Sequence, residues 1–281
     1  MFNSIYLVPK LNSENDPVVT SIVSAIKTMC NKITVTIVDT KRCVSPNTLV
    51  VAIGGDGTML EAMRTAAKYE AGVIGINLGR VGFLTDIGAE GWLHKYSMPH
   101  VVHMLEDLLM SRQKYYEEPR TILQMAGYDD LACNEISVSR ILSDSMITFR
   151  LRVDDSDAGI HRANTILVAT STGSTAYSLS GGGALMMPAV DALQIVPIAP
   201  LTMTSRPIII PNSSSVTIDA WGKGIAVRAD GTTVTTNENI FTQETPFSVR
   251  IFPYKHKARL IHFEGWNFFN VLTQKLGWQK E

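Results

Sequence analysis

The sequence predicts a two-domain α+β protein, with an N-terminal α/β domain on a parallel sheet and a C-terminal antiparallel β-sandwich. In the first hundred residues, short apolar runs alternate with segments of helical spacing. From about residue 120, short runs rich in Thr, Ile and Val recur between clusters of turn residues. The last stretch, from about residue 266 to 278, returns to helical spacing, and we expect this helix to pack back on the N-terminal domain.

In the N-terminal domain, strands are expected at residues 5–8, 33–38, 49–53 and 73–76. These runs are apolar without alternation, which is typical of parallel strands covered on both faces. A first helix is expected to begin at Asp16-Pro17, where Asp is the N-cap and Pro fills the first turn. A second helix is expected from about residue 58 to 69.

In the C-terminal part, strands are expected at residues 121–125, 136–139, 147–153, 165–169, 208–210, 216–218 and 247–251. Turn clusters at residues 154–157 and 211–214 separate some of these strands. The basic run at residues 255–257, together with Arg259, is expected in a solvated turn. The expected domain boundaries are 1–98, 99–262 and 263–281.

The composition excludes several classes of protein. Twenty-five Lys and Arg against 26 Asp and Glu give a net charge of −1, which does not indicate a nucleic-acid partner. The three cysteines are odd in number and lack zinc-ligand spacing, so we expect reduced thiols; they are Cys30, Cys43 and Cys133. No apolar run approaches the length of a membrane span. We therefore expect a cytoplasmic protein without membrane contact.

A glycine-rich loop follows the third expected strand and leads into the second helix. Glycines in such a loop let the backbone approach a ligand closely, and the helix N-terminus offers N–H groups to phosphate. Asp56 is the unusual member, because a carboxylate repels phosphates unless it meets a metal or accepts the proton of an attacking hydroxyl. The alternative is a simple N-cap. The loop has neither the Walker A nor the GxGxxG pattern, and it consists of Gly54, Gly55, Asp56, Gly57 and Thr58.

Further residues have the chemistry of a nucleotide pocket. The Asn134 amide both donates and accepts, which suits an adenine edge, and Glu135 can accept two hydrogen bonds from a ribose diol. Thr175, Ala176 and Tyr177 offer a small apolar wall with a polar handle for a stacked base, and Phe83 is a candidate for the opposite side. The alternatives are a strand-start cap for Asn134-Glu135 and a core aromatic for Tyr177.

The loop at residues 54–57 resembles the Gly-Gly-Asp-Gly signature of NAD kinases, diacylglycerol and sphingosine kinases, and phosphofructokinases. Other segments resemble NAD kinases in particular, and the similarity runs in order from about Leu49 to Phe263. The block at residues 172–182, Thr-Gly-Ser-Thr-Ala-Tyr-Ser-Leu-Ser-Gly-Gly, is the most specific of them. The remaining matching segments are residues 77–85, Asn134-Glu135, Arg206-Pro207 and Asp230-Gly231.

This resemblance implies a kinase that phosphorylates the 2′-hydroxyl of the adenosine ribose of NAD(H), with a Rossmann-like first domain and the active site between the domains. Asp56 would activate the hydroxyl. ATP or polyphosphate would be the donor, and a divalent metal such as Mg²⁺ would be held mainly by phosphates, with no dedicated protein ligands. A homodimer or homotetramer is also implied. The implied nucleotide-binding residues are Gly54, Gly55, Gly57, Thr58, Phe83, Asn134, Glu135, Arg162, Asn164, Thr172, Gly173, Ser174, Thr175, Ala176, Tyr177 and Ser180.

The sequence departs from the family pattern at Asn164, Ser171 and Leu201, where an aspartate, a proline and a histidine are usual. Asn164 removes a negative charge, which would weaken binding of the oxidised dinucleotide or favour NADH or another adenosine-containing ligand. Two alternatives therefore stay open. One is a kinase for another adenosine nucleotide, and the other is a non-catalytic protein that senses NAD or NADP.

Overall fold

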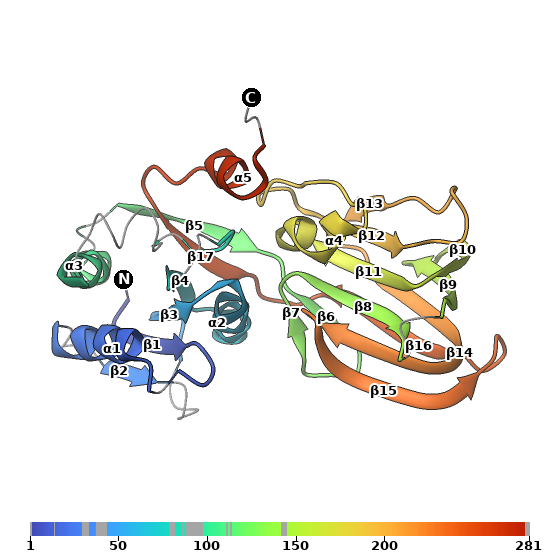
Figure 1. The fold of residues 1–281 in the computed structure, drawn as a ribbon, viewed down its shortest axis with the longest axis horizontal. Coiled ribbons are helices and arrows are strands. Elements are labelled where there is room, and N and C mark those ends of the chain that lie inside the picture. The colour runs from blue at the N-terminus through green and yellow to red at the C-terminus, as the bar shows by residue number, and fades with distance from the viewer. Residues whose placement is uncertain are drawn as a thin grey trace. The chain divides into compact units, whose positions relative to one another are not determined.

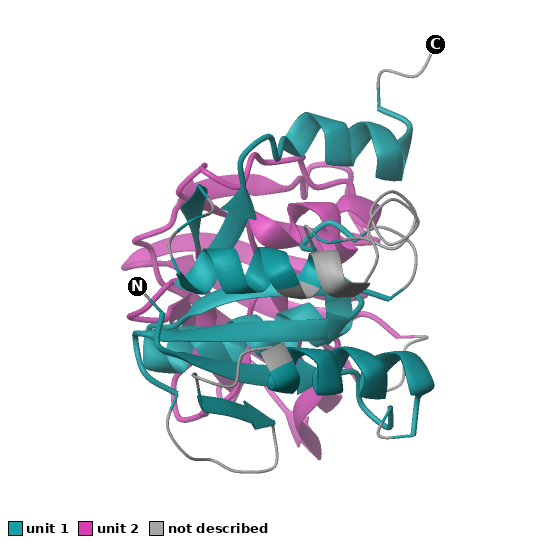
Figure 2. Ribbon diagram, turned by 90° about the vertical axis from the view of Figure 1, so that its left-hand side faces the viewer, with its two compact units in different colours: residues 1–119, 258–281 teal, residues 120–257 magenta. Residues whose placement is uncertain are grey.

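The computed structural model describes residues 2–13, 15–29, 34–37, 44–78, 82–85, 87, 98–110, 112, 114–141 and 145–278. The chain divides into two compact units (Figure 2): unit 1 comprises Met1–Pro119 with Ala258–Glu281, and unit 2 comprises Arg120–Lys257. Unit 1 thus includes residues 99–119 and 258–262, which the sequence-based boundaries place in the β-rich domain. These segments supply two strands to the unit 1 sheet, which explains their place in unit 1.

Unit 1 is an α/β unit built on a six-stranded sheet of order β2-β1-β3-β4-β17-β5 (Figure 1). Strand β1 pairs in parallel with β2 and β3, β3 pairs in parallel with β4, and β4 pairs in parallel with β17. The elements are β1 (Ser4–Pro9), α1 (Pro17–Met29), β2 (Thr34–Ile37), β3 (Thr48–Gly54), α2 (Asp56–Tyr69), β4 (Gly72–Asn77), α3 (Met98–Leu109), β5 (Tyr115–Arg120), β17 (Ala258–Phe263) and α5 (Phe268–Leu276).

Helices cover both faces of this sheet, which is why its strands are apolar without alternation. Every residue of β3 is buried. Leu49, Val51 and Ile53 pack in one cluster with side chains of α1 and α3. The buried face of α2 packs against β3, β4 and β17 and consists of Met59, Ala62, Met63, Ala66 and Ala67. The predicted α/β unit with a parallel sheet is confirmed.

Unit 2 is built on an eleven-stranded sheet, and among the described residues its neighbouring strands pair antiparallel. Its main path is β13-β12-β11-β8-β14-β16-β6-β7, with β9, β10 and β15 attached beside it. The elements are β6 (Leu123–Met125), β7 (Leu131–Ala132), β8 (Glu135–Arg140), β9 (Ile147–Val153), β10 (Ser156–Ala163), β11 (Thr165–Thr170), the 3₁₀ turn η2 (Thr172–Thr175), α4 (Tyr177–Ser180), β12 (Ala192–Ile198), β13 (Ile208–Pro211), β14 (Val216–Ala229), β15 (Thr232–Phe241) and β16 (Phe247–Pro253).

The long strand β14 joins the two halves of unit 2. Its first part pairs with β9 and β16, and its second part pairs with β8 and β15. Gly222 and Gly224, with φ of 122° and 70°, lie where the partners change and adopt a backbone that other residues rarely reach. Side chains from both parts enclose one core around the fully buried Phe149. The predicted antiparallel β domain is confirmed.

Several local expectations can be compared with the structure. The Asp16 carboxylate caps α1, accepting the N–H groups of Val18 and Val19 at 2.9 and 3.3 Å. Helix α2 begins at Asp56, earlier than the expected residue 58, and β14 extends well beyond residues 216–218. The expectation for Ile33 and Val38 lies outside the described residues, as do Cys30 and Cys43.

The expectation for Arg259 is wrong. Residues 255–257 form a turn, but Arg259 lies in β17. Its Nε and Nη2 donate to the Glu117 carboxylate at 2.8 and 3.0 Å, and its Nη1 donates to the carbonyl of Glu70 at 2.8 Å. The partners are distant in sequence, so the local run of basic residues gave no sign of them. Within the described part of the chain, no helix is long and apolar enough to cross a membrane.

Candidate active site

The glycine-rich loop lies at a topological switch point of the unit 1 sheet. From β1 the chain moves outward to β2, whereas from β3 it moves in the opposite direction to β4. In open α/β sheets, ligands bind beside the carboxyl ends of the strands where the order reverses. Residues 54–58 leave β3 at that point, and the loop after β1 begins with Lys10, whose N–H donates to the Ile53 carbonyl at 2.9 Å.

The loop backbone is shaped for close approach. A Cβ on Gly54 would lie 2.3 Å from Thr58 Oγ1, so this position is restricted to glycine unless Thr58 moves. Around Gly55 and Gly57 the space is open. Gly55 is the N-cap of α2 and provides no side-chain cap, so the N–H groups of the first turn remain available to an anion.

The Asp56 carboxylate is fixed by a second loop, which follows β4. It accepts the N–H groups of Phe83 and Leu84 at 3.0 and 3.3 Å. A Cβ on Gly82 would lie 2.0 Å from Asp56 Oδ1, so the loop backbone lies directly against the carboxylate. Two accepted hydrogen bonds leave a carboxylate with further lone pairs, so Asp56 can still accept a proton from a ligand.

The loop after β4 is itself held by Asn77. The side-chain amide of this buried residue donates to Thr85 Oγ1 at 3.1 Å, and its backbone N–H donates to the Ile87 carbonyl at 2.7 Å. The structure therefore brings the predicted Phe83 segment to Asp56 within unit 1. Gly79, Arg80 and Val81, which belong to the same predicted motif, lie outside the described residues.

In unit 2, the predicted pair Asn134-Glu135 lies where β8 begins. Thr170, at the end of β11, donates its N–H to the Asn134 carbonyl at 2.9 Å and its hydroxyl to the Cys133 carbonyl at 2.6 Å. From the other side, the Asp230 carboxylate accepts the N–H groups of Cys133, Asn134 and Glu135 at 2.9, 2.7 and 3.3 Å. The short segment carrying the pair is thus held through both its carbonyls and its N–H groups.

Glu135 is buried, and its Oε2 atom has no hydrogen-bond partner among the described residues. Burial and, to a smaller extent, the nearby charge of Asp230 together raise the pKa of this carboxyl to about 7. An unpartnered buried carboxylate oxygen costs free energy, which a donor such as a ribose hydroxyl would recover. Perturbed pKa values of this kind gather at functional sites.

The block at residues 172–182 supplies a tight turn and a short helix beside Asn134. A Cβ on Gly173 would lie 2.1 Å from the Asn134 carbonyl oxygen, so only glycine fits this approach. Ser174 is buried, and its hydroxyl bonds the carbonyls of Ser171 and Met186 at 2.7 and 3.2 Å. Thr172 is also buried and accepts from Arg120 Nη1 at 3.2 Å. In this structure these three predicted residues hold the turn together.

The other members of the block reach the surface. Tyr177 is 44% exposed, Ser180 is exposed, and Thr175 and Ala176 are half-buried. These side chains are thus at least partly open to solvent, whereas Thr172, Gly173 and Ser174 are buried in the turn.

Comparisons with known proteins agree on the family. A family model for the ATP-NAD kinase N-terminal domain matches residues 10–107, and one for the ATP-NAD kinase C-terminal domain matches residues 133–257. An NAD kinase from Acidovorax ebreus (strain TPSY) is 33% identical over 238 residues, which cover 82% of this chain and 74% of the relative. An NAD kinase from Aeromonas salmonicida (strain A449) is 35% identical over 241 residues, covering 82% and 76%.

The chain belongs to the NAD kinase family. The NAD kinase function predicted from the sequence is thereby confirmed.

Two solved structures have the same fold. The NAD kinase from Archaeoglobus fulgidus, in complex with ATP, aligns with a TM-score of 0.73 at 25% identity, over 98% of each chain. Yeast NADH kinase, complexed with NADH, aligns with a TM-score of 0.79 at 20% identity, over 100% of this chain and 89% of that one.

Two departures from the NAD kinase pattern lie close together in unit 2. The N–H of Asn164 donates to the Ile198 carbonyl at 3.0 Å, and the N–H of Leu201 donates to the Arg162 carbonyl at 2.8 Å. Arg162 is exposed, Asn164 is half-buried, and Leu201 is 57% exposed. The segments around residues 162–164 and 198–201 are thus paired through their backbones.

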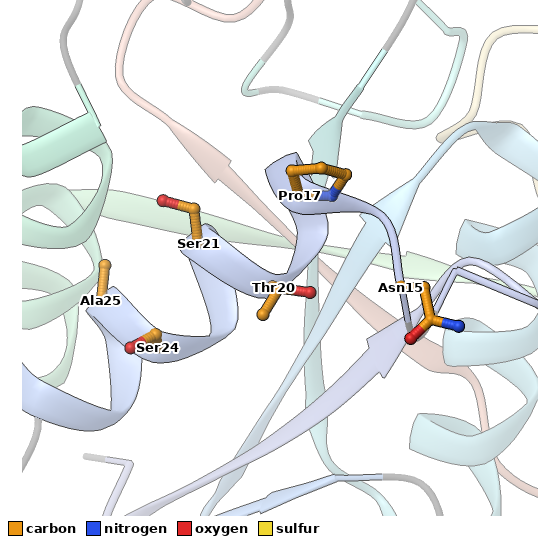
Figure 3. A pocket seen from close by; sticks show the side chains of 6 residues that line it. All are labelled: Asn15, Pro17, Thr20, Ser21, Ser24 and Ala25. Atoms are coloured by element: carbon orange, nitrogen blue, oxygen red, sulfur yellow. The ribbon is translucent and has the colours of Figure 1, made fainter.

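An open cavity of unit 1 does not coincide with these residues. It has a volume of about 730 Å³ and lies along α1 (Figure 3), lined by Asn15, Pro17, Thr20, Ser21, Ser24 and Ala25. None of these side chains is charged or was predicted as a site residue. Because its lining lacks a group for phosphate charge or proton transfer, the chemistry favours the glycine-rich loop as the site.

Sequence reasoning left two residues out of the candidate site. Asp230 was noted only as part of a matching turn, although its carboxylate holds residues 133–135. Gly82 was noted only within a motif, although its missing side chain leaves room for the Asp56 carboxylate. In both cases the partner lies far away in the sequence, so no local pattern marked the contact.

Proposed function

We propose that this member of the NAD kinase family transfers the γ-phosphate of ATP to the 2′-hydroxyl of the adenosine ribose of NAD or NADH. The ribose oxygen forms a bond to the γ-phosphorus, the bond from that phosphorus to the β–γ bridging oxygen breaks, and ADP leaves. Asp56 accepts the hydroxyl proton. The observation that carries this role is the fixed Asp56 carboxylate, held by two N–H groups at the glycine-rich loop.

We propose that unit 2 binds the dinucleotide. The unpartnered Oε2 of Glu135 supports its role as acceptor for a ribose diol. The exposed ring of Tyr177 and the half-buried Ala176 support a stacking wall for the base. The other proposed nucleotide contacts are Gly54, Gly55, Gly57, Thr58, Phe83, Asn134, Arg162, Asn164, Thr175 and Ser180, while Thr172, Gly173 and Ser174 are proposed to hold the turn that carries Thr175.

The proposed donor is ATP, in keeping with the ATP complex of the A. fulgidus relative. Among the described residues, no group of three His, Cys, Asp or Glu side chains is arranged to hold a metal ion. Mg²⁺, when bound, would therefore be held mainly by the donor phosphates, where it neutralises charge on the transferred group. A cytoplasmic homodimer or homotetramer is part of the same proposal, and light scattering of the purified protein measures its mass.

The test is to incubate the purified protein with ATP, Mg²⁺ and either NAD or NADH, and to measure NADP(H) with a coupled dehydrogenase. Asp56→Asn removes the proton acceptor, and we expect kcat to fall by about 10²–10⁴-fold. Asp107→Asn is the matched control, because that carboxylate on α3 faces His103 of the same helix and Arg112 just after it. Equal kcat values for Asp56→Asn and the parent protein would disprove the role of Asp56.

The same assay tests the alternative acceptors. A panel of adenosine nucleotides beside NAD and NADH shows whether the loss of charge at Asn164 has changed the substrate. Faster phosphorylation of another nucleotide than of either dinucleotide would replace the proposed acceptor. Binding of NAD that is unaffected by Asp56→Ala, without any product, would indicate a sensor.

A further inference from the structure

We propose that Asp230 is a positioning residue of the dinucleotide site, whose carboxylate fixes the backbone of residues 133–135 and so orients Asn134 and Glu135. This inference rests on the proposed function, because it concerns how the proposed base and ribose contacts are held. Asp230 itself need not touch the ligand.

The segment needs such support because Cys133 and Asn134 lie outside the strand ladders. Strand β7 ends at Ala132 and β8 begins at Glu135, so Cys133 and Asn134 lie between two strands. Buried N–H groups without a ladder partner require another acceptor. The Asp230 carboxylate provides it for three successive N–H groups, the shortest at 2.7 Å, and hydrogen bonds to an ionised acceptor are stronger than neutral ones.

The backbone around Asp230 is fixed in turn. Asp230 and Gly231 form the turn between β14 and β15, with φ of 48° and 79°. The N–H of Asp230 donates to the Glu135 carbonyl at 3.0 Å, so the turn and the segment are bonded in both directions. A left-handed backbone at a non-glycine residue is tolerated best by Asp and Asn, so Asp230→Asn removes the charge without straining the turn.

Asp230 also acts on Glu135 through its charge. Of the strands beside β8, β11 carries no charged residue and β14 carries Asp219, Lys223 and Arg228; Asp230 lies in the turn directly after β14. Arg228 Nη1 donates to Ser139 Oγ at 2.8 Å, and Arg120 reaches the neighbouring turn through Thr172. Burial and then Asp230 raise the pKa of Glu135 to about 7.

This arrangement gives a readout that a purely structural residue would not change. The ionised Glu135 carboxylate accepts both hydroxyls of a diol, whereas its protonated form has lost acceptor capacity. We therefore expect kcat/KM for NAD to fall as the pH drops below about 7, where Glu135 takes up its proton. Removing the negative charge at Asp230 lowers the pKa of Glu135, so this fall moves to lower pH.

The experiment compares four variants in the NADP-forming assay across the neutral pH range. Asp230→Asn should raise KM for NAD by about tenfold or more and change kcat less. It should also move the fall of kcat/KM at acidic pH, the acid limb of the profile, to lower pH. Asp230→Glu keeps the charge but displaces it, so KM should rise while the acid limb stays. Glu135→Gln should abolish the limb.

Asp154→Asn is the matched control. Asp154 also has a positive φ, of 53°, and its carboxylate also accepts a backbone N–H, that of Ser215 at 2.8 Å, in a different turn of unit 2. If Asp230→Asn changes only thermal stability, as Asp154→Asn should, the inference is wrong and the proposed function stands. If Glu135→Gln changes neither KM nor the pH profile, the proposed ribose contact itself fails.

Discussion

The two units use the same device, a carboxylate that accepts backbone N–H groups of a distant segment, for different purposes. In unit 1 the anchored carboxylate is Asp56, the proposed reacting group, which is bonded to the N–H groups of Phe83 and Leu84. In unit 2 the anchored carboxylate is Asp230, and the proposed ligand contact is the neighbouring Glu135, whose Oε2 has no partner among the described residues.

The difference shows how one interaction can serve proton transfer or recognition. A carboxylate whose own oxygens accept N–H groups is held in one orientation, which suits a base that must meet a hydroxyl in line with phosphate. A carboxylate carried on an anchored backbone keeps an oxygen for the ligand, but its burial without a partner raises its pKa.

The largest effect is expected at the anchor of Asp56. In Gly82→Ala the new Cβ would lie 2.0 Å from Asp56 Oδ1, so the carboxylate or the loop must shift. Misplacing a catalytic group by about 1 Å costs about 100-fold, so we expect kcat to fall by about that factor. KM for NAD should change little, since the proposed dinucleotide contacts of unit 2 are untouched. Steady-state kinetics measures both.

A double-mutant cycle shows whether Gly82 acts through Asp56. If it does, Asp56→Ala combined with Gly82→Ala should be no slower than Asp56→Ala alone. Additive losses would mean that the substitution harms the site in another way. Unchanged kcat in Gly82→Ala would show that the loop does not set the orientation of the carboxylate.

The anchors also mark where prediction from the sequence reaches its limit. Strands β1, β3 and β4 and the start of α1 follow from apolar runs and an Asp-Pro cap, which are local signals. Strand β17 was missed because it joins the unit 1 sheet beside β4, far away in the sequence. Its residues Arg259 and His262 are polar, yet both pair with glutamates of β5, Glu117 and Glu118.

For the candidate site, motifs identified the residues but not what each one does. The resemblance grouped Thr172, Ser174 and Tyr177 as ligand contacts, yet the structure buries the first two in the turn and exposes the third. Likewise, no pattern indicated that Asp230 supports Glu135. Roles of this kind depend on burial and on hydrogen bonds between distant segments, which sequence spacing does not contain.

Replacing Glu135 is expected to have an intermediate effect, on the pH dependence of the unfolding free energy. A carboxyl whose pKa is about 7 in the folded protein and 4.5 when unfolded binds more protons when folded, so the unfolding free energy falls as pH rises from about 4.5 to 7. The span of about 2.5 pH units corresponds to about 3 kcal/mol as an upper value. Glu135→Gln should remove this pH-dependent loss.

Denaturant unfolding of Glu135→Gln and the parent protein at pH 5 and pH 8 measures the change. The amide introduced by Glu135→Gln also needs hydrogen-bond partners. We therefore expect the same offset in unfolding free energy at both pH values, and this offset is subtracted. The variant should gain about 2–3 kcal/mol relative to the parent between the two pH values. The same pH dependence in both proteins would mean that the pKa of Glu135 is not raised in the folded protein.

The smallest effect concerns an ion pair in each unit. In unit 1, Arg259 bonds both oxygens of Glu117 and the Glu70 carbonyl, with side chains 31% and 37% exposed for the pair. In unit 2, Lys257 bonds Asp191 at 2.7 Å, with side chains 41% and 64% exposed.

Arg259→Met should lower the unfolding free energy by about 1–2 kcal/mol, because a bidentate pair and a carbonyl partner are lost. Lys257→Met should stay within about 0.5 kcal/mol, as expected for a single exposed pair. Thermal unfolding with and without added salt measures the loss of unfolding free energy in each variant. Equal losses would show that the contacts of Arg259 stabilise the protein no more than the single exposed pair of Lys257 does.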